Sequence, residues 1–146
     1  MKIVSRILAA AAVLFLVCSS SVYVYPAPKD KTAQTSGQPA ISFAEQQHNF
    51  GFIPEKGGPV THSFEFVNTG DAPLVIISAT ASCGCTRPTY PTEPIAPGKS
   101  GKIKVTYLPE GRPGEFDKTV KVRTNVKESK KISLRITGTV TPDNSK

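Results

Sequence analysis

Short stretches in which apolar and polar residues alternate run through the last two thirds of the chain, and this pattern constrains the fold most. His62, Phe64 and Phe66 fall on one side of such a stretch, while polar residues fill the positions between them. Alternation with a period of two is typical of β-strands that bury one face. No segment has convincing helical periodicity. Further alternating stretches occupy residues 41–43, 102–107, 120–123 and 131–136.

About seven such strands, separated by turns every eight to twelve residues, predict an all-β, immunoglobulin-like β-sandwich. A chain of 146 residues with 38% hydrophobic residues fits one domain with a modest core. Tryptophan is absent, and the two cysteines of the domain are near neighbours, so the core disulfide of antibody domains is not expected. The apolar run Leu74–Ile77 predicts a strand that is buried on both sides.

The N-terminus has the layout of a secretory signal peptide. Two basic residues precede an unbroken apolar run, Ile7–Val17, which three serines follow. We expect cleavage after Ser21 and export to the periplasm or cell surface. Two alternatives would leave the protein anchored in the membrane, namely a retained segment lengthened by residues 22–25, or lipidation of Cys18.

The composition divides the chain into four parts. We expect a signal peptide over residues 1–21, a disordered linker over 22–39, the sandwich over 40–142 and a short tail over 143–146. The linker contains too little apolar surface to offset the entropy lost on ordering it. The formal net charge of the whole chain is +7, of which the signal peptide contributes two cations.

The motif Ser82-Cys83-Gly84-Cys85-Thr86 is the most unusual constellation in the sequence. If the preceding strand stays extended, Ile77, Ala79, Ala81 and both cysteines project to one face. The α-carbons of the two cysteines would then be about 6.5 Å apart, near the upper limit for a disulfide. In an oxidising compartment the simplest interpretation is a local disulfide between Cys83 and Cys85, which closes too small a ring to stabilise the domain strongly.

Two other interpretations of the cysteine pair remain open. Adjacent thiolates suit copper or half of a zinc site, with His48, expected in a loop, as a further ligand. Alternatively, both cysteines are reduced and buried as small apolar side chains. His62 shares the inward side of its strand with two phenylalanines and is expected to be a core histidine. No other cofactor is indicated.

No common catalytic motif occurs in the sequence. A Gly-x-Ser-x-Gly elbow, a His-Glu-x-x-His helix and a glycine-rich phosphate loop are all missing, and a cysteine nucleophile would have only His48 as a base. We therefore do not expect an enzyme.

Basic residues alternate along the last three predicted strands, where they could form one basic sheet face. A solvated surface is the simpler explanation, and a polyanion-binding site is the alternative. The residues are Lys102, Lys104, Lys121, Arg123, Lys131 and Arg135.

Several motifs in a fixed order carry a family resemblance. They are Phe50-Gly51, the segment 64–70 (Phe-Glu-Phe-Val-Asn-Thr-Gly), the segment 82–86, Ile95-Ala96-Pro97-Gly98, Tyr107-Leu108-Pro109 and the segment 136–140 (Ile-Thr-Gly-Thr-Val). From about Ile41 to Pro142 the chain resembles a bacterial exported family of unknown function. That family is similar in turn to immunoglobulin-like domains related to major sperm protein and to the ASPM/SPD-2/Hydin domains. The resemblance implies a seven-stranded sandwich with an interaction role, and it implies neither an enzyme nor a ligand.

Together these observations predict a binding or scaffolding module of the cell envelope without catalytic activity. We expect its partner to be another envelope protein or a cell-wall component, and not a nucleic acid. Membrane contact is expected only through an uncleaved or lipidated N-terminus. The alternative function is a copper-binding or thiol redox protein that uses Cys83 and Cys85.

Overall fold

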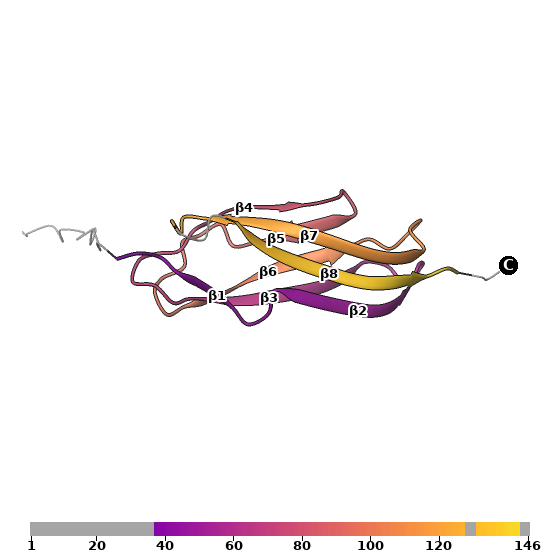
Figure 1. Ribbon diagram of the computed structural model, residues 1–146, viewed down its shortest axis with the longest axis horizontal. Helices are drawn as coiled ribbons and strands as arrows, with labels where there is room; N and C mark the ends of the chain where they lie inside the picture. Colours follow the sequence, from indigo (N-terminus) through magenta and orange to yellow (C-terminus); the bar gives the residue numbers. More distant parts are fainter. Residues whose placement is uncertain (1–36, 128–130, 144–146) are drawn as a thin grey trace, which may run out of the picture. The chain divides into compact units, whose positions relative to one another are not determined.

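The computed structural model describes residues 37–127 and 131–143, which form two four-stranded β-sheets packed face to face (Figure 1). The first sheet has the order β1-β3-β6-β5 and the second sheet has the order β2-β8-β7-β4. The prediction of an all-β, immunoglobulin-like sandwich is confirmed, with eight strands in place of about seven. The strands are β1 (Ile41–Phe43), β2 (Gln47–Pro54), β3 (Val60–Asn68), β4 (Ile76–Ala81), β5 (Thr86–Thr89), β6 (Ser100–Tyr107), β7 (Gly114–Thr124) and β8 (Ile132–Thr141).

The parts of the chain outside the described residues include several predicted features. The predicted signal peptide, most of the predicted linker and the last three residues of the predicted tail lie there. Gln38, at the end of that linker, already contacts the domain, since its carbonyl accepts a 3.0 Å hydrogen bond from Asp71 N. Asp143 of the predicted tail forms an ion pair with Lys56. Within the described residues there is no helix long and apolar enough to cross a membrane.

The alternating side chains of the central strands form the core. Phe64 and Phe66 of β3, together with Ile103 and Val105 of β6, point between the sheets and are almost completely buried. The second sheet contributes Leu134 and other apolar side chains from β7 and β8 to the same core. Period-two patterning places one face of each strand in this apolar layer and the other in solvent.

One buried polar residue, Asn68, connects several loops. Its side-chain amide donates 2.8 Å hydrogen bonds to the carbonyls of Ala72 and Ile95, and its Oδ1 accepts a 3.0 Å bond from Gly70 N. Asn68 is fully buried. Because the buried amide of Asn68 bonds to residues of both loops, Asn68 fixes the loops that precede β4 and β6.

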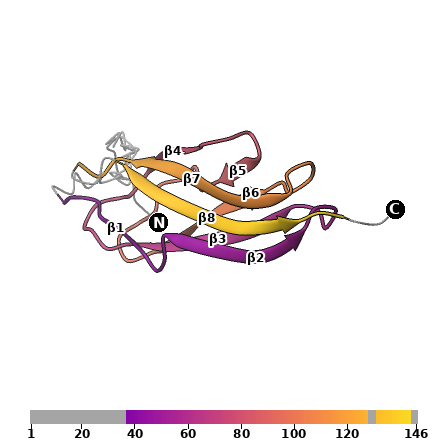
Figure 2. The same ribbon diagram turned by 45° about the vertical axis from the view of Figure 1, so that its right-hand side comes forward.

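The chain crosses from one sheet to the other at both edges of the sandwich. Residues 44–46 connect β1 of the first sheet to β2 of the second, and residues 82–85 connect β4 of the second sheet to β5 of the first. Figures 1 and 2 both show β2 beside β3 at one edge and β4 beside β5 at the other. We call the first the histidine edge, after His48 and His62, and the second the cysteine edge, after Cys83 and Cys85.

Two expectations about individual strands were wrong. The run Leu74–Ile77 is not buried on both sides, because one face of each strand in a two-layer sandwich points to solvent, and Ile77 on that face is 51% exposed. A register irregularity between Ile76 and Ser78 places Ile77 outside while Ala79 and Ala81 pack against the core. Strand β5 was missed because its four residues include Pro88, which disfavours strands except at sheet edges.

Candidate functional site

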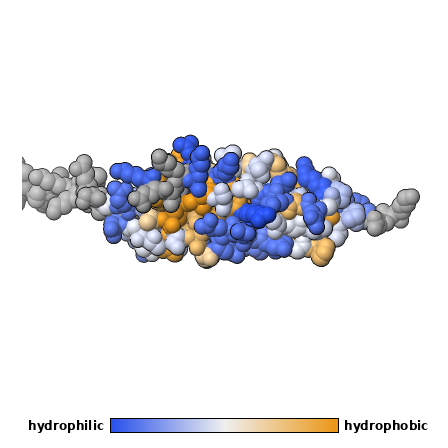
Figure 3. Space-filling view, in the orientation of Figure 1, coloured by the Kyte–Doolittle hydropathy of each residue, from blue (hydrophilic) through white to orange (hydrophobic). Residues whose placement is uncertain are grey.

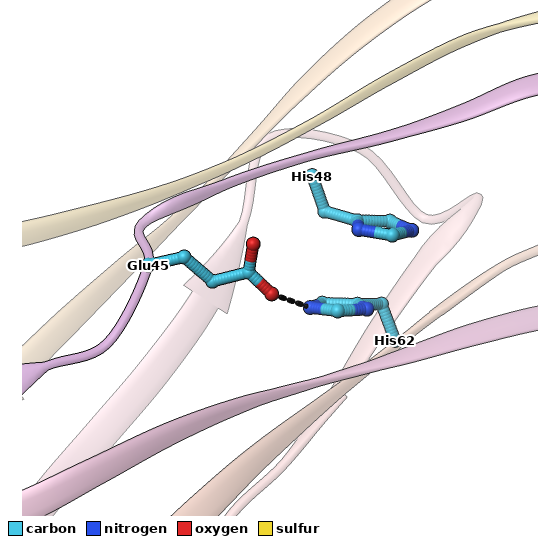
Figure 4. A group of neighbouring side chains, drawn as sticks. All are labelled: Glu45, His48 and His62. Carbon is cyan, nitrogen blue, oxygen red and sulfur yellow. Dashed lines mark hydrogen bonds and ion pairs between the residues drawn. The ribbon is translucent and has the colours of Figure 1, made fainter.

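Three side chains that bind metals in many proteins meet between the sheets at the histidine edge (Figure 4). His48 comes from β2, His62 comes from β3, and Glu45 comes from the crossover that joins β1 to β2. The two imidazole rings are stacked, with centroids 3.6 Å apart and planes only 8° from parallel. Glu45 Oε1 lies 2.6 Å from His62 Nε2. Among the described residues, this is the group of three such side chains in which the donor atoms converge, all within 4.8 Å of one another.

Local chain geometry explains why His48 faces inward. His48 and Phe50 alternate toward the core along β2, until a bulge interrupts the pairing with β8 between Asn49 and Phe52. Gly51 adopts φ +68° there, and Asn49 Oδ1 accepts a 2.8 Å hydrogen bond from its amide. A positive φ is easily accessible only to glycine. The bulge returns Ile53 to the core and turns Phe52 outward, where it is 79% exposed.

The histidine pair continues into the aromatic part of the core. His48 packs edge-on against Phe50, with centroids 4.7 Å apart, and His62 packs edge-on against Phe64 at 4.8 Å. Phe50 in turn lies 6.4 Å from Phe116. These ring contacts restrict the movement of both imidazoles, because each histidine belongs to a strand and packs against a phenylalanine ring of the same strand.

The environment of His48 favours the neutral form of its imidazole. Burial lowers the pKa of His48 below its usual value, the neighbouring His62 lowers it further, and Glu45 opposes both effects. The His62 side chain is 19% exposed and that of Glu45 is 48% exposed, so the site is open on the crossover side. Neutral imidazole nitrogens beside a carboxylate can bind a divalent metal ion.

At the cysteine edge, Cys83 and Cys85 are joined by a disulfide across Gly84, with α-carbons 5.3 Å apart. The preceding strand does not stay extended through the cysteines, because β4 ends at Ala81 and a turn follows. Cys85 is buried and belongs to the core, and its carbonyl accepts a 2.9 Å hydrogen bond from Leu108 N. The disulfide therefore lies within the crossover that connects the two sheets.

His48 does not join the cysteine pair. It lies on β2 and not in a loop, and β8 and β7 separate β2 from β4 in the second sheet. Three strand spacings amount to about 14 Å, which is too far for shared coordination of one metal ion. The sequence analysis identified His48 as a candidate metal ligand but did not identify Glu45 and His62 as the residues beside it. Nothing in the sequence marked Glu45 as a ligand. The alternation in its strand indicated that His62 is a core residue, and its position at the edge of the sandwich leaves its side chain 19% exposed.

The six basic residues that could have formed one sheet face do not share a face, because the chain changes sheet between β6 and β7. Lys102 and Lys104 lie on the first sheet, and the other basic residues lie on or beside strands of the second. Arg135 forms a two-point ion pair with Asp117, which lowers the pKa of that carboxyl group mainly through the hydrogen bond. Glu65 pairs directly opposite Lys102. Both outer faces therefore carry mixed charges.

Two surface hollows lie away from the histidine edge. One, of ≈450 Å³, is lined by the loops after β2 and β6, and its Glu55 and Arg112 bond to backbone groups of the same loops. The other, of ≈590 Å³, lies over the second sheet beside Phe52 and includes Asp117 and Arg135. Hydrophilic residues cover most of the surface in the view of Figure 3, and hydrophobic ones form smaller areas. Phe52 is the most exposed large hydrophobic side chain of the described residues.

Comparisons with solved structures identify the fold. A protein of unknown function from Porphyromonas gingivalis W83 matches with a TM-score of 0.59 and 15% identity, covering 71% of this chain and 47% of that one. A PapD-like domain of human CEP192 matches with a TM-score of 0.54 and 12% identity, covering 73% of this chain and 89% of that one. The secreted serine protease VesC from Vibrio cholerae matches with a TM-score of 0.53 and 14% identity, covering 69% and 23%.

These identities establish the immunoglobulin-like, PapD-like fold alone. The chain spans less than half the length of the Porphyromonas protein and of VesC. No curated protein matches the chain in sequence. A family model described as "Protein of unknown function (DUF1573)" matches residues 41–140, which is most of the chain and all of the sandwich except the last residue of β8. The chain therefore belongs to this family of proteins of unknown function.

Proposed function

We propose that the chain is a non-catalytic binding module of the bacterial cell envelope, which recognises a protein partner through the outer face of the second sheet around Phe52. The exposure of Phe52 carries this proposal. An aromatic ring that is 79% exposed loses apolar contact with water when a partner covers it, and aromatic residues and arginine are enriched where proteins bind one another. Arg135 and Asp117 lie in the hollow beside it and offer polar contacts at its border.

The shapes of the edge strands favour a partner that binds to the face of a sheet over one that adds a strand to its edge. All four edge strands are short or irregular: β1 has three residues, β5 has four and contains Pro88, and β2 and β4 each carry a register irregularity. Such edges present few regularly spaced backbone groups to an incoming strand. A partner is therefore expected to dock on side chains, and Phe52 is the side chain most available for this.

The proposed location in the cell envelope is based on the N-terminal sequence, and the disulfide between Cys83 and Cys85 agrees with it. The first 21 residues are typical of a signal peptide, and disulfides persist in exported proteins. Mass spectrometry of the chain isolated from its own cell envelope tests this part. A mature N-terminus near Val22 supports export with cleavage, whereas an intact Met1 on a chain recovered from the cytoplasm contradicts it.

Site-specific photocrosslinking in living cells tests the binding face. A photoreactive phenylalanine analogue is placed at position 52 of the full chain, and the matched control carries it at position 102 on the outer face of the first sheet. We expect a discrete adduct from position 52 only. Excess unmodified chain should suppress this adduct, and excess Phe52→Ser chain should not.

Each other outcome of this experiment has a defined meaning. Equal adducts from both positions, or suppression by the Phe52→Ser chain, would show that Phe52 does not direct binding. An adduct with a glycan strand and not with a protein would replace the proposed partner by a cell-wall component.

A further inference from the structure

The histidine edge holds a set of donor atoms that the proposed binding face does not use. Glu45, His48 and His62 lie on three different segments, and their donor atoms converge to within 4.8 Å. Both imidazoles extend from strands and are fixed by the rings of Phe50 and Phe64. The strands therefore hold two of the three donors close together before any ion arrives, which reduces the entropy lost on binding, although the stacked rings must turn to point their nitrogens at a shared ion.

The spacing of the donors fits a small ion. Two ligands on a tetrahedral zinc ion are about 3.3 Å apart, given metal–ligand distances of about 2.0 to 2.1 Å. The donor atoms of the three side chains all lie within 4.8 Å of one another, and turning the face-to-face imidazole rings out of their stack lets two nitrogens point at one ion. Glu45 is on a crossover and half-exposed, so its carboxylate is free to rotate away from its 2.6 Å contact with His62 Nε2 and share an ion with it.

The chemistry of the donors narrows the choice of metal. Two imidazole nitrogens and one carboxylate oxygen suit zinc and neighbouring first-row divalent ions. Calcium and magnesium prefer sites made of oxygen atoms alone, and Cu(I) prefers sulfur ligands. The exposed side of the crossover leaves room for a water molecule as the fourth ligand.

We propose that Glu45, His48 and His62 form a zinc-binding site that clamps the first crossover and strand β2 onto strand β3. The ion joins the two sheets at the histidine edge, because His62 belongs to the first sheet and His48 to the second. This site is separate from the cysteine pair, where the described residues supply no third ligand.

Titration calorimetry with zinc chloride tests the site on the natively processed chain without a polyhistidine tag. We expect one zinc ion per chain and a higher melting temperature with zinc than with a chelator. Two variants remove a ligand while keeping its contacts: His48→Phe retains a flat ring in the stack, and Glu45→Gln retains a hydrogen-bonding group beside His62. Each should raise the dissociation constant by about tenfold or more, since loss of a residue that only orients a ligand already has an effect of this size.

Melting in the presence of chelator separates ligand loss from misfolding. Both variants should melt there like the wild type, and the Cys83→Ala/Cys85→Ala chain should keep the zinc affinity of the wild type. Absence of saturable zinc binding at one ion per chain would overturn the proposal. So would binding that survives both ligand variants, or binding that the cysteine variant abolishes.

Discussion

At both edges of the sandwich the chain crosses from one sheet to the other, but different side chains hold the two crossovers in place. At each edge the chain passes between the sheets in three or four residues. The cysteine edge is closed by a covalent link, the Cys83–Cys85 disulfide, with Cys85 buried in the core. The histidine edge is closed by a stacked imidazole pair and a partly exposed carboxylate, all of which can gain or lose protons or bind an ion.

This difference separates a fixed edge from an adjustable one. A disulfide in an oxidising compartment does not respond to pH or to metal ions, whereas histidine is the side chain whose charge changes near neutral pH. Five measurements test this contrast, from the largest expected effect to the smallest.

Substitution of Asn68, which bonds to the loops before β4 and β6, should have the largest effect on stability. Replacing Asn68 by alanine removes its bonds to the carbonyl of Ala72 and the amide of Gly70, while the Ile95 carbonyl keeps its bond from Leu74 N, so we expect a loss of about 3 kcal/mol in the free energy of unfolding. Urea unfolding monitored by circular dichroism measures it. The exposed Thr69→Ala is the matched control and should change stability little. A small loss for Asn68→Ala would mean that water replaces its hydrogen bonds.

Removing the covalent link at the cysteine edge should have a moderate effect. A ring of about three residues contributes about 1 to 2 kcal/mol by restricting the unfolded chain, and truncating buried Cys85 adds a packing loss. We expect the Cys83→Ala/Cys85→Ala chain to lose about 2 kcal/mol in urea unfolding. If its stability equals that of the oxidised wild type, the crossover is held by its backbone hydrogen bonds, such as the one from Leu108 N to Cys85 O, and not by the disulfide.

At the histidine edge, truncation should destabilise the metal-free protein less. Replacing His62 by alanine removes the ring stack and the hydrogen bond to Glu45, and the partly open position lets water fill the space. We expect a loss of about 1 kcal/mol with chelator present. A loss as large as that of the cysteine variant would show that the edge is rigid even without an ion.

The pH dependence of stability should also come from the histidine edge. Because burial and His62 lower the pKa of His48, the unfolded chain binds a proton more readily than the folded chain as the pH falls through about 6.5. The metal-free protein should therefore lose stability as the pH falls below this value. Melting curves at several pH values in chelator measure this, and His48→Phe should flatten the dependence. The cysteine variant should retain it.

Phe52 should matter least for folding. Because its ring is 79% exposed, Phe52→Ser should change the free energy of unfolding by no more than about 0.5 kcal/mol. The same substitution should abolish competition in the crosslinking experiment. A large loss of stability would instead assign Phe52 a structural role in the bulge of β2.

Local patterning predicted much of the fold because it depends on neighbouring residues. The alternation of His62, Phe64 and Phe66 correctly placed these side chains on the inner face of β3. Strand β5 and the irregularity in β4 were missed, since Pro88 hides one and nothing local marks the other. Which face of a strand points to solvent depends on how the two sheets pack, which is why Ile77 is exposed although it ends an apolar run.

By itself the sequence determined the all-β class, the inner and outer faces of most strands, and the proximity of Cys83 and Cys85, because these follow from side-chain period and spacing. Only the tertiary structure decided which distant residues meet. His48 and His62 are 14 positions apart and Glu45 lies on a crossover, and they converge because β2 and β3 belong to different sheets that face each other at one edge. The same sheet order separates His48 from the cysteines and divides the basic residues between two faces. Long-range strand pairing produces these arrangements, and no local pattern encodes it.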